Sequence, residues 1–170
     1  MKEVSFKDFD ILSEQDKSEA LALLHRYDQI DKQDSCQKDF ISFVKHLWPE
    51  FIEGRHHKII GDKFNKIAQG KLKRLIVCLP PRHSKSEFAS TYFPAWMMGR
   101  RGDLKIIQTT HTAELAVRFG RKVRNIIDSE EYQHIFPELK LQADNKSAGR
   151  WTTNQEGESF YAGVGGAITG

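Results

Sequence analysis

The chain has 170 residues, the length of one complete domain or of part of a larger one. Hydrophobic residues make up 39% and charged residues 29%, so the chain can bury a core and is not a disordered chain. No apolar run reaches the roughly 18–20 residues of a membrane span, and the first residues lead into no apolar signal core. Cys36 and Cys78 are far apart and lack metal-ligand spacing. These features predict a soluble intracellular protein with two reduced thiols, neither secreted nor bound to a membrane.

The net charge of +3 conceals an uneven distribution along the chain. Residues 1–39 carry −4 and residues 129–170 carry −3, whereas residues 40–128 hold 17 Lys/Arg against 7 Asp/Glu, a charge of +10. A basic centre suits phosphate groups, either of a nucleotide or of nucleic acid. Lysines on solvated helix surfaces produce the same count, so the charge alone favours a phosphate partner only slightly.

Helical spacing of apolar residues dominates the first 70 residues. Ser13 is a good N-cap for a helix over about 14–31. Apolar stripes predict two further helices, over about 40–47 and 59–68. We therefore expect residues 1–70 to form a helical N-terminal segment.

After residue 70 the pattern changes to alternating strands and helices. Residues 75–79 form a short apolar run, which is typical of a strand buried on both faces of a parallel sheet. A second strand is expected over 104–110. In the sequence, a helix over about 85–98 precedes it and a helix over about 112–128 follows it. This order predicts a doubly wound α/β sheet. Further strand candidates are residues 150–153 and 158–164, followed by a loop over 163–170.

The loop between the first strand and its helix has the sequence Leu-Pro-Pro-Arg-His-Ser-Lys-Ser, residues 79–86. A phosphate-binding loop needs a tight turn of backbone N–H groups, a Lys that reaches the β- and γ-phosphates, and a Ser or Thr whose hydroxyl binds Mg²⁺. Lys85 and Ser86 fit the last two roles. Because the two prolines have no N–H, the backbone donors must come from residues 82–86.

Two positions of this loop depart from the standard phosphate-loop pattern. Leu79 and Ser84 stand where that pattern has glycines. A Ser held at positive φ costs roughly 1 kcal/mol relative to Gly, which a folded protein tolerates.

Residues 79–86, with Phe93-Pro94-Ala95-Trp96 downstream, resemble the ATPase domain of the large terminase subunit of tailed bacteriophages. That family often shows Pro-Pro-Arg-His-Gly-Lys-Ser followed by Pro-Ala-Trp, so Ser84 is the main departure. Similar segments follow the same order along residues 40–170. They are 43–49 with 56–60, 109–112 with 115–124, and 165–170, which looks like the loop before the family's Walker B strand.

The resemblance implies a motor that uses ATP and Mg²⁺ to translocate double-stranded DNA into a procapsid. Its fold would be a P-loop NTPase of the RecA/ASCE type, with a parallel-sheet core over residues 71–170 and no nuclease domain within this chain. Its partners would be DNA, the small terminase subunit, the portal protein of the procapsid and further copies of itself. The protein would act in the host cell cytoplasm and transiently at the portal.

The resemblance also assigns roles to single residues. Lys85 would hold the β- and γ-phosphates, Ser86 the Mg²⁺, and Arg82 would act in cis on the γ-phosphate, where a guanidinium neutralises developing charge. An ion pair with a nearby carboxylate is the alternative for Arg82. Glu87 also has a simpler explanation in the helix dipole, and Trp48 a simpler one as a core aromatic. The full nucleotide-binding set is Pro81, Arg82, His83, Ser84, Lys85, Ser86 and Glu87, with Trp48 and His57 on the adenine side.

Three basic residues share the face opposite the apolar stripe of the 112–128 helix. Arg118, Arg121 and Lys122 would contact the DNA backbone or a neighbouring subunit. The simpler explanation, which the sequence favours, is a solvated helix face.

The carboxylate pair that ATP hydrolysis requires has no candidate in this chain. The family places that pair on the strand after the loop 165–170, so we expect the chain to end inside the ATPase domain and to have negligible ATPase activity alone. Two alternatives stay open. One is a remnant or split-gene product that binds nucleotide, DNA or terminase partners without hydrolysis, and the other is a fragment of a different P-loop NTPase.

Overall fold

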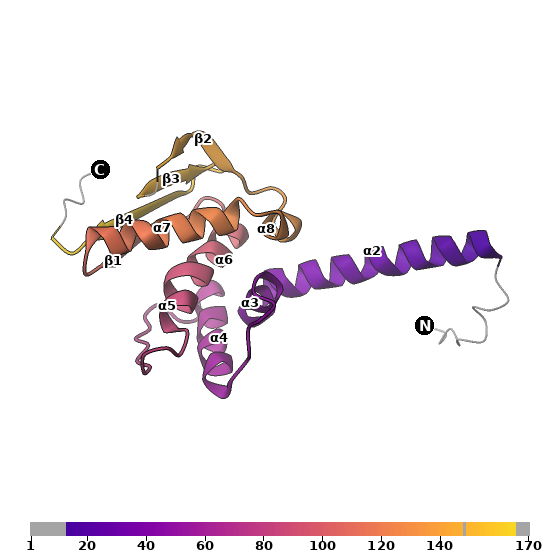
Figure 1. Ribbon diagram of the computed structural model, residues 1–170, viewed down its shortest axis with the longest axis horizontal. Helices are drawn as coiled ribbons and strands as arrows, with labels where there is room; N and C mark the ends of the chain where they lie inside the picture. Colours follow the sequence, from indigo (N-terminus) through magenta and orange to yellow (C-terminus); the bar gives the residue numbers. More distant parts are fainter. Residues whose placement is uncertain (1–12, 148, 166–170) are drawn as a thin grey trace. The chain divides into compact units, whose positions relative to one another are not determined.

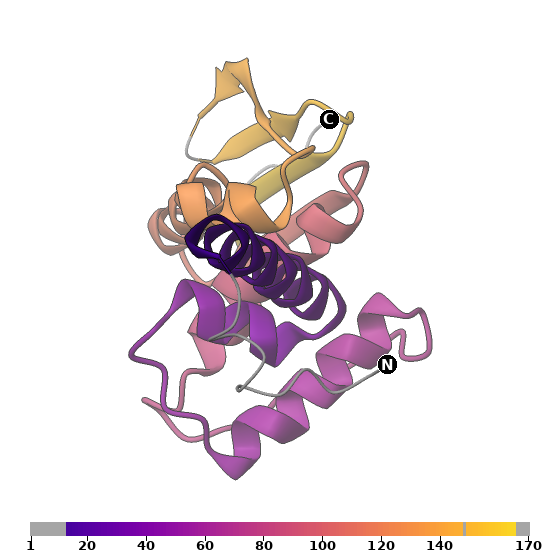
Figure 2. The same cartoon turned by 90° about the vertical axis from the view of Figure 1, so that its right-hand side faces the viewer.

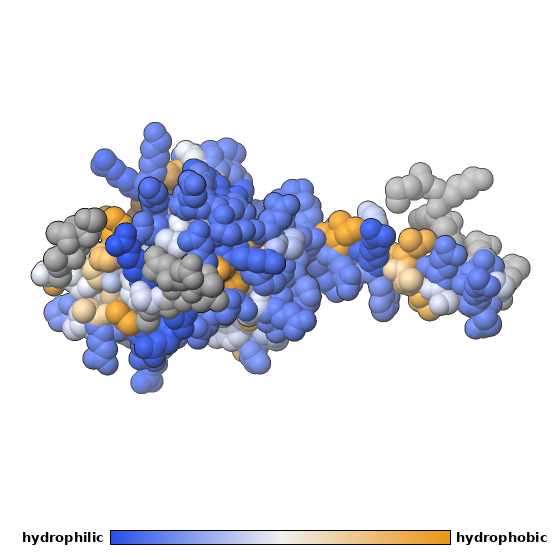
Figure 3. All heavy atoms as spheres, turned by 90° about the horizontal axis from the view of Figure 1, so that it is seen from above, coloured by the Kyte–Doolittle hydropathy of each residue, from blue (hydrophilic) through white to orange (hydrophobic). Residues whose placement is uncertain are grey.

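The computed structural model describes residues 13–147 and 149–165, in two compact units that divide between Asp34 and Ser35. The first unit, as described, is the exposed N-terminal part of helix α2 (Glu14–Lys38). Apolar side chains form patches on the surface of this helix, coloured orange in Figure 3. None of the described helices is both long enough and apolar enough to cross a membrane.

Ser13 caps α2, as the sequence predicts, because its Oγ accepts the N–H of Asp16 at 3.2 Å. The helix continues to Lys38, beyond the expected end near residue 31. Its last turn belongs to the second unit, where Cys36 is buried and its carbonyl accepts the indole N–H of Trp96 at 2.8 Å.

The second unit combines helices with one four-stranded sheet (Figure 1). Figure 2 shows the strands at one end of this unit and α4 at the other. The helices are α3 (Phe40–Leu47), α4 (Arg55–Ala68), α5 (Lys85–Glu87), the π-helix η1 (Phe88–Tyr92), α6 (Phe93–Arg100), α7 (Ala113–Ile127) and α8 (Glu130–Ile135). The strands are β1 (Lys105–Thr110), β2 (Leu141–Lys146), β3 (Arg150–Thr153) and β4 (Glu158–Gly163).

The sheet is mixed, with the strand order β1-β4-β3-β2. Strand β1 pairs in parallel with β4, so that Lys105 lies opposite Glu158 and Thr110 opposite Gly163. The other two pairs, β4 with β3 and β3 with β2, are antiparallel. Helix α7 packs against β4 and β1 (Figure 1). The α/β class is therefore confirmed, whereas the expected parallel sheet is wrong for the described strands, of which only β1 and β4 pair in parallel.

The apolar run 75–79 is not a strand, contrary to the prediction from sequence. Residues 72–80 are irregular, and the side chain of Ile76 is 90% exposed. A continuous apolar run becomes a buried strand only where neighbours supply hydrogen bonds and cover both faces. No described strand pairs with this run, and only its alternate residues, Leu75, Val77 and Leu79, pack against the core.

Phe40 lies at the centre of an aromatic core that joins the helices. The N-cap Asp39, whose carboxylate accepts the N–H of Ser42 at 2.8 Å, places Phe40 at the start of α3. The ring of Phe40 is fully buried and makes edge-to-face contacts with Phe64 at 5.0 Å and Phe88 at 5.3 Å between centroids. These contacts join α3 to α4 and to η1.

The segments α5, η1 and α6 form one helical run over residues 85–100, which confirms the expected helix and extends it. Within it, the N–H of Phe93 bonds to the carbonyl of Phe88, five residues back. Pro94 has no N–H to donate to the preceding turn, so the change of register falls next to it.

We predict that Phe40→Ala lowers the free energy of unfolding of the second unit by about 3–5 kcal/mol, because it leaves a cavity between three helices. Urea denaturation followed by circular dichroism measures this loss. Ile52→Ala, at an exposed position, is the matched control and should change stability by less than about 0.5 kcal/mol. Equal losses in the two variants would contradict the placement of the core.

Candidate functional site

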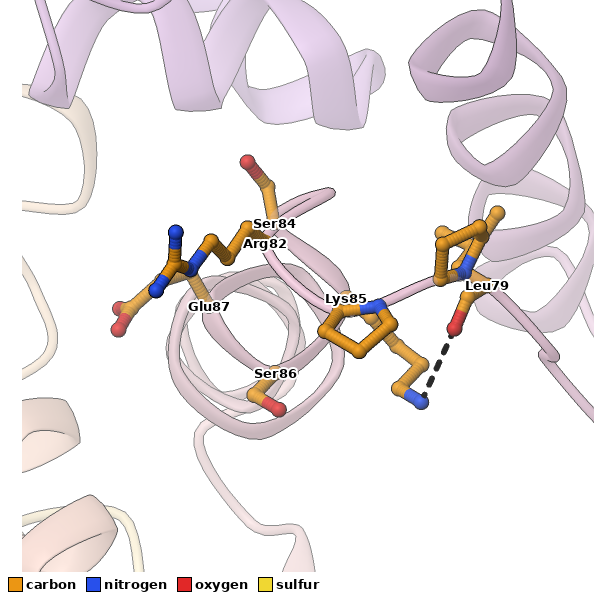
Figure 4. A pocket seen from close by; sticks show the side chains of 8 residues that line it. Leu79, Arg82, Ser84, Lys85, Ser86 and Glu87 are labelled. Atoms are coloured by element: carbon orange, nitrogen blue, oxygen red, sulfur yellow. Dashed lines mark hydrogen bonds between the residues drawn. The ribbon is translucent and has the colours of Figure 1, made fainter.

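Eight residues, from the end of the irregular segment 72–80 through helix α5, line a hollow of about 550 Å³ (Figure 4). The sequence predicts that seven residues of this loop contact nucleotide, and all of them except His83 line the hollow. The lining residues are Leu79, Pro80, Pro81, Arg82, Ser84, Lys85, Ser86 and Glu87.

Two non-glycine residues of this loop have left-handed backbone conformations. Ser84 has φ 57° and ψ 10°, and Arg82 has φ 64°. Each costs an L-residue roughly 1–2 kcal/mol, and such strain clusters at functional sites. Ser84 thus takes the conformation for which the standard phosphate loop uses glycine at this position.

Ser84 is also the residue from which the helical run begins, since its carbonyl accepts the N–H of Phe88 at 2.9 Å. The N–H groups of Lys85, Ser86 and Glu87 therefore lie in the first helical turn, where the helix itself offers no acceptor. Free N–H groups and the positive end of the helix dipole together favour an anion at this turn.

The two cations of the loop have no carboxylate partner among the described residues. The ammonium group of Lys85 lies 3.5 Å from the carbonyl oxygen of Leu79, at the outer limit of a hydrogen bond. In Figure 4 the side chains of Lys85 and Ser86 extend to one side of the loop, whereas those of Arg82 and Glu87 extend to another. Lys85 and Arg82 are thus both available to an anionic ligand, from different directions.

Glu87 is paired with a residue of a different helix. Its carboxylate accepts a hydrogen bond from the ammonium group of Lys122 in α7 at 2.5 Å. Lys122 had been expected on an outward face with Arg118 and Arg121. Arg118 and Arg121 are exposed, whereas Lys122 is half-buried and turns toward the loop.

His83 connects the loop to the start of α4 rather than lining the hollow. Its Nδ1 donates a hydrogen bond to the carbonyl of Pro81 at 2.9 Å. Its ring centroid is 5.5 Å from that of His56, which in turn is 3.8 Å from that of His57. Three imidazoles are therefore close together beside the loop.

The two residues proposed for the adenine side lie in packed surroundings and do not line the hollow. Trp48 stacks on Tyr92, with 5.9 Å between ring centroids and 7° between planes. His57 is only 6% exposed, and its ring lies 4.8 Å from that of Phe51. Both side chains thus make aromatic contacts in this structure, and His57 is almost wholly buried.

Two of these contacts have no signal in the amino-acid sequence. Glu87 and Lys122 are 35 residues apart, and His56 and His83 are 27 apart, so neither pair shows a helical or strand spacing. Among the described residues no group of three or more His, Cys, Asp or Glu side chains could hold a metal ion.

Comparisons of the chain with protein-family models, with curated proteins and with solved structures find no match. The argument for phosphate binding therefore depends on the geometry of the loop.

The buried histidine makes stability depend on pH. Burial, together with His56 and His83, lowers the pKa of His57 below its ordinary value of 6.5, although Glu53 opposes the shift. The Nδ1 of His57 accepts the N–H of Gly54 at 2.9 Å and must be unprotonated to do so. Since the unfolded chain binds this proton more readily, stability is full above about pH 6.5 and decreases as the pH falls below it.

We predict that His57→Gln reduces the loss of stability between pH 7 and pH 5, because glutamine does not titrate. Urea midpoints at the two pH values measure the effect. His134→Gln, which removes an exposed imidazole from α8, is the matched control. The interpretation fails if the two variants keep the same pH dependence.

Proposed function

We propose that residues 79–87 bind the phosphate groups of Mg-ATP, within the ATPase motor of a phage terminase large subunit that drives double-stranded DNA into a procapsid. The observation that carries the proposal is the left-handed Ser84 directly before Lys85, at the start of a helical run. This combination aims backbone N–H groups and an unpaired ammonium group at one hollow.

In this proposal the chain's own residues divide the phosphate contacts. The N–H groups of residues 82–86 hold the anion, and the ammonium group of Lys85 moves from the Leu79 carbonyl to the β- and γ-phosphates. The hydroxyl of Ser86 contributes one ligand to Mg²⁺, which neutralises charge on the phosphates when bound. Arg82, exposed and without an ion-pair partner in the described chain, is free to reach the γ-phosphate in cis.

The wider assignment rests on the resemblance of residues 40–170 to the terminase ATPase domain. It includes a P-loop NTPase core, a place in the host cytoplasm and at the portal, and an assembly with further subunits and the small terminase subunit. Arg118 and Arg121, both exposed on α7, are the residues we assign to the DNA backbone or to a neighbouring subunit.

We predict that the chain binds Mg-ATP and that Lys85→Ala weakens binding by about 10- to 100-fold. The reason is the loss of charge-assisted hydrogen bonds worth about 1.5–3 kcal/mol. Isothermal titration calorimetry of the 170-residue chain, with and without Mg²⁺, measures the affinity.

Lys140→Ala serves as the control, because it removes an exposed lysine outside the loop and should bind as the unmodified chain does. Equal affinities of the unmodified chain and Lys85→Ala, or no binding by either, would refute the phosphate-binding role.

A further inference from the structure

The ion pair between Glu87 and Lys122 places a carboxylate and its compensating charge at the edge of the phosphate-binding hollow. Glu87 lines the hollow and directly follows Ser86. Its side chain is 36% exposed and that of Lys122 is 39% exposed, so solvent screens the pair only in part. The two groups lie 2.5 Å apart, from Nζ to Oε1.

An uncompensated carboxylate at this position would oppose the proposed ligand. A nucleoside triphosphate carries several negative charges, and like charges repel across the short distance between Glu87 and a ligand in the hollow. Lys122 removes most of this repulsion by neutralising Glu87. It also draws the carboxylate toward α7, away from the side on which Lys85 and Ser86 extend (Figure 4).

A purely stabilising role accounts for the pair less well. Ion pairs that are partly open to solvent contribute little to folding stability. The helical run after the loop is already held by Phe88, which is buried against Phe40 and Phe51. The consequence of losing Lys122 should therefore appear in ligand affinity more than in stability.

We infer that Lys122 is a positioning residue for the phosphate loop, which neutralises Glu87 and orients it so that a polyphosphate can occupy the hollow. This inference rests on the proposed nucleotide site. It gives Lys122 a role distinct from the DNA or subunit contacts of Arg118 and Arg121.

The test is a set of Mg-ATP titrations by calorimetry on the 170-residue chain. Lys122→Ala should weaken binding on the order of tenfold, and Lys122→Arg should preserve it. The double variant Glu87→Gln/Lys122→Ala should bind within about twofold of Glu87→Gln, because no charge then needs compensation. The loss in Lys122→Ala should also shrink as NaCl rises from about 50 to 500 mM.

Lys66→Ala is the matched control, since it breaks an ion pair with Asp62 on α4. It should leave Mg-ATP affinity unchanged, and thermal melts should show that every variant remains folded. The inference is overturned if Lys122→Ala binds Mg-ATP as tightly as the unmodified chain does, or if the double variant binds it as weakly as Lys122→Ala does. In either case the proposed nucleotide site stands. Failure of the unmodified chain to bind Mg-ATP overturns both.

Discussion

The burial of Phe88 is the constraint on which the candidate site depends. Its ring lies against those of Phe40, at 5.3 Å, and His57, at 5.0 Å. Because Phe88 directly follows residues 85–87, its burial fixes the helical turn that presents their N–H groups. The segment 72–80 on the other side of the loop has no strand partner among the described residues. The loop is thus held mainly from its helical end, and the packing of that end maintains the strained conformation of Ser84.

Helices α3, α4 and α7 could be predicted from the sequence because each buries an apolar stripe whose spacing is local. The prediction failed where structure depends on partners distant in the chain. Residues 75–79 have the composition of a buried strand but no described neighbour to pair with, so they remain irregular. Strand β2, by contrast, has the polar sequence Leu-Gln-Ala-Asp-Asn-Lys and was not expected. It forms because β3 supplies an antiparallel partner, which no propensity of its own residues reveals.

The sequence could identify the residues that line the loop because they are consecutive, and their order carries the phosphate-loop pattern. It could not reveal the contacts that tie the loop to other elements. Lys122 looked like one of three outward cations, since helical spacing cannot tell which cation meets a carboxylate 35 residues away. The assignment of His57 and Trp48 to a ligand came from the resemblance, and their ring contacts with Phe51 and Tyr92 could not be predicted from the sequence.

The central claim is that the backbone N–H groups of residues 82–86 hold phosphate. Two-dimensional ¹H–¹⁵N NMR of the labelled chain during a titration with Mg-ADP tests this most directly, because each amide reports its own environment. Our account predicts the largest shift changes at these five amides, since charge-assisted hydrogen bonds to phosphate form there. Shift changes confined to other parts of the chain, or none at a saturating concentration of Mg-ADP, would contradict it.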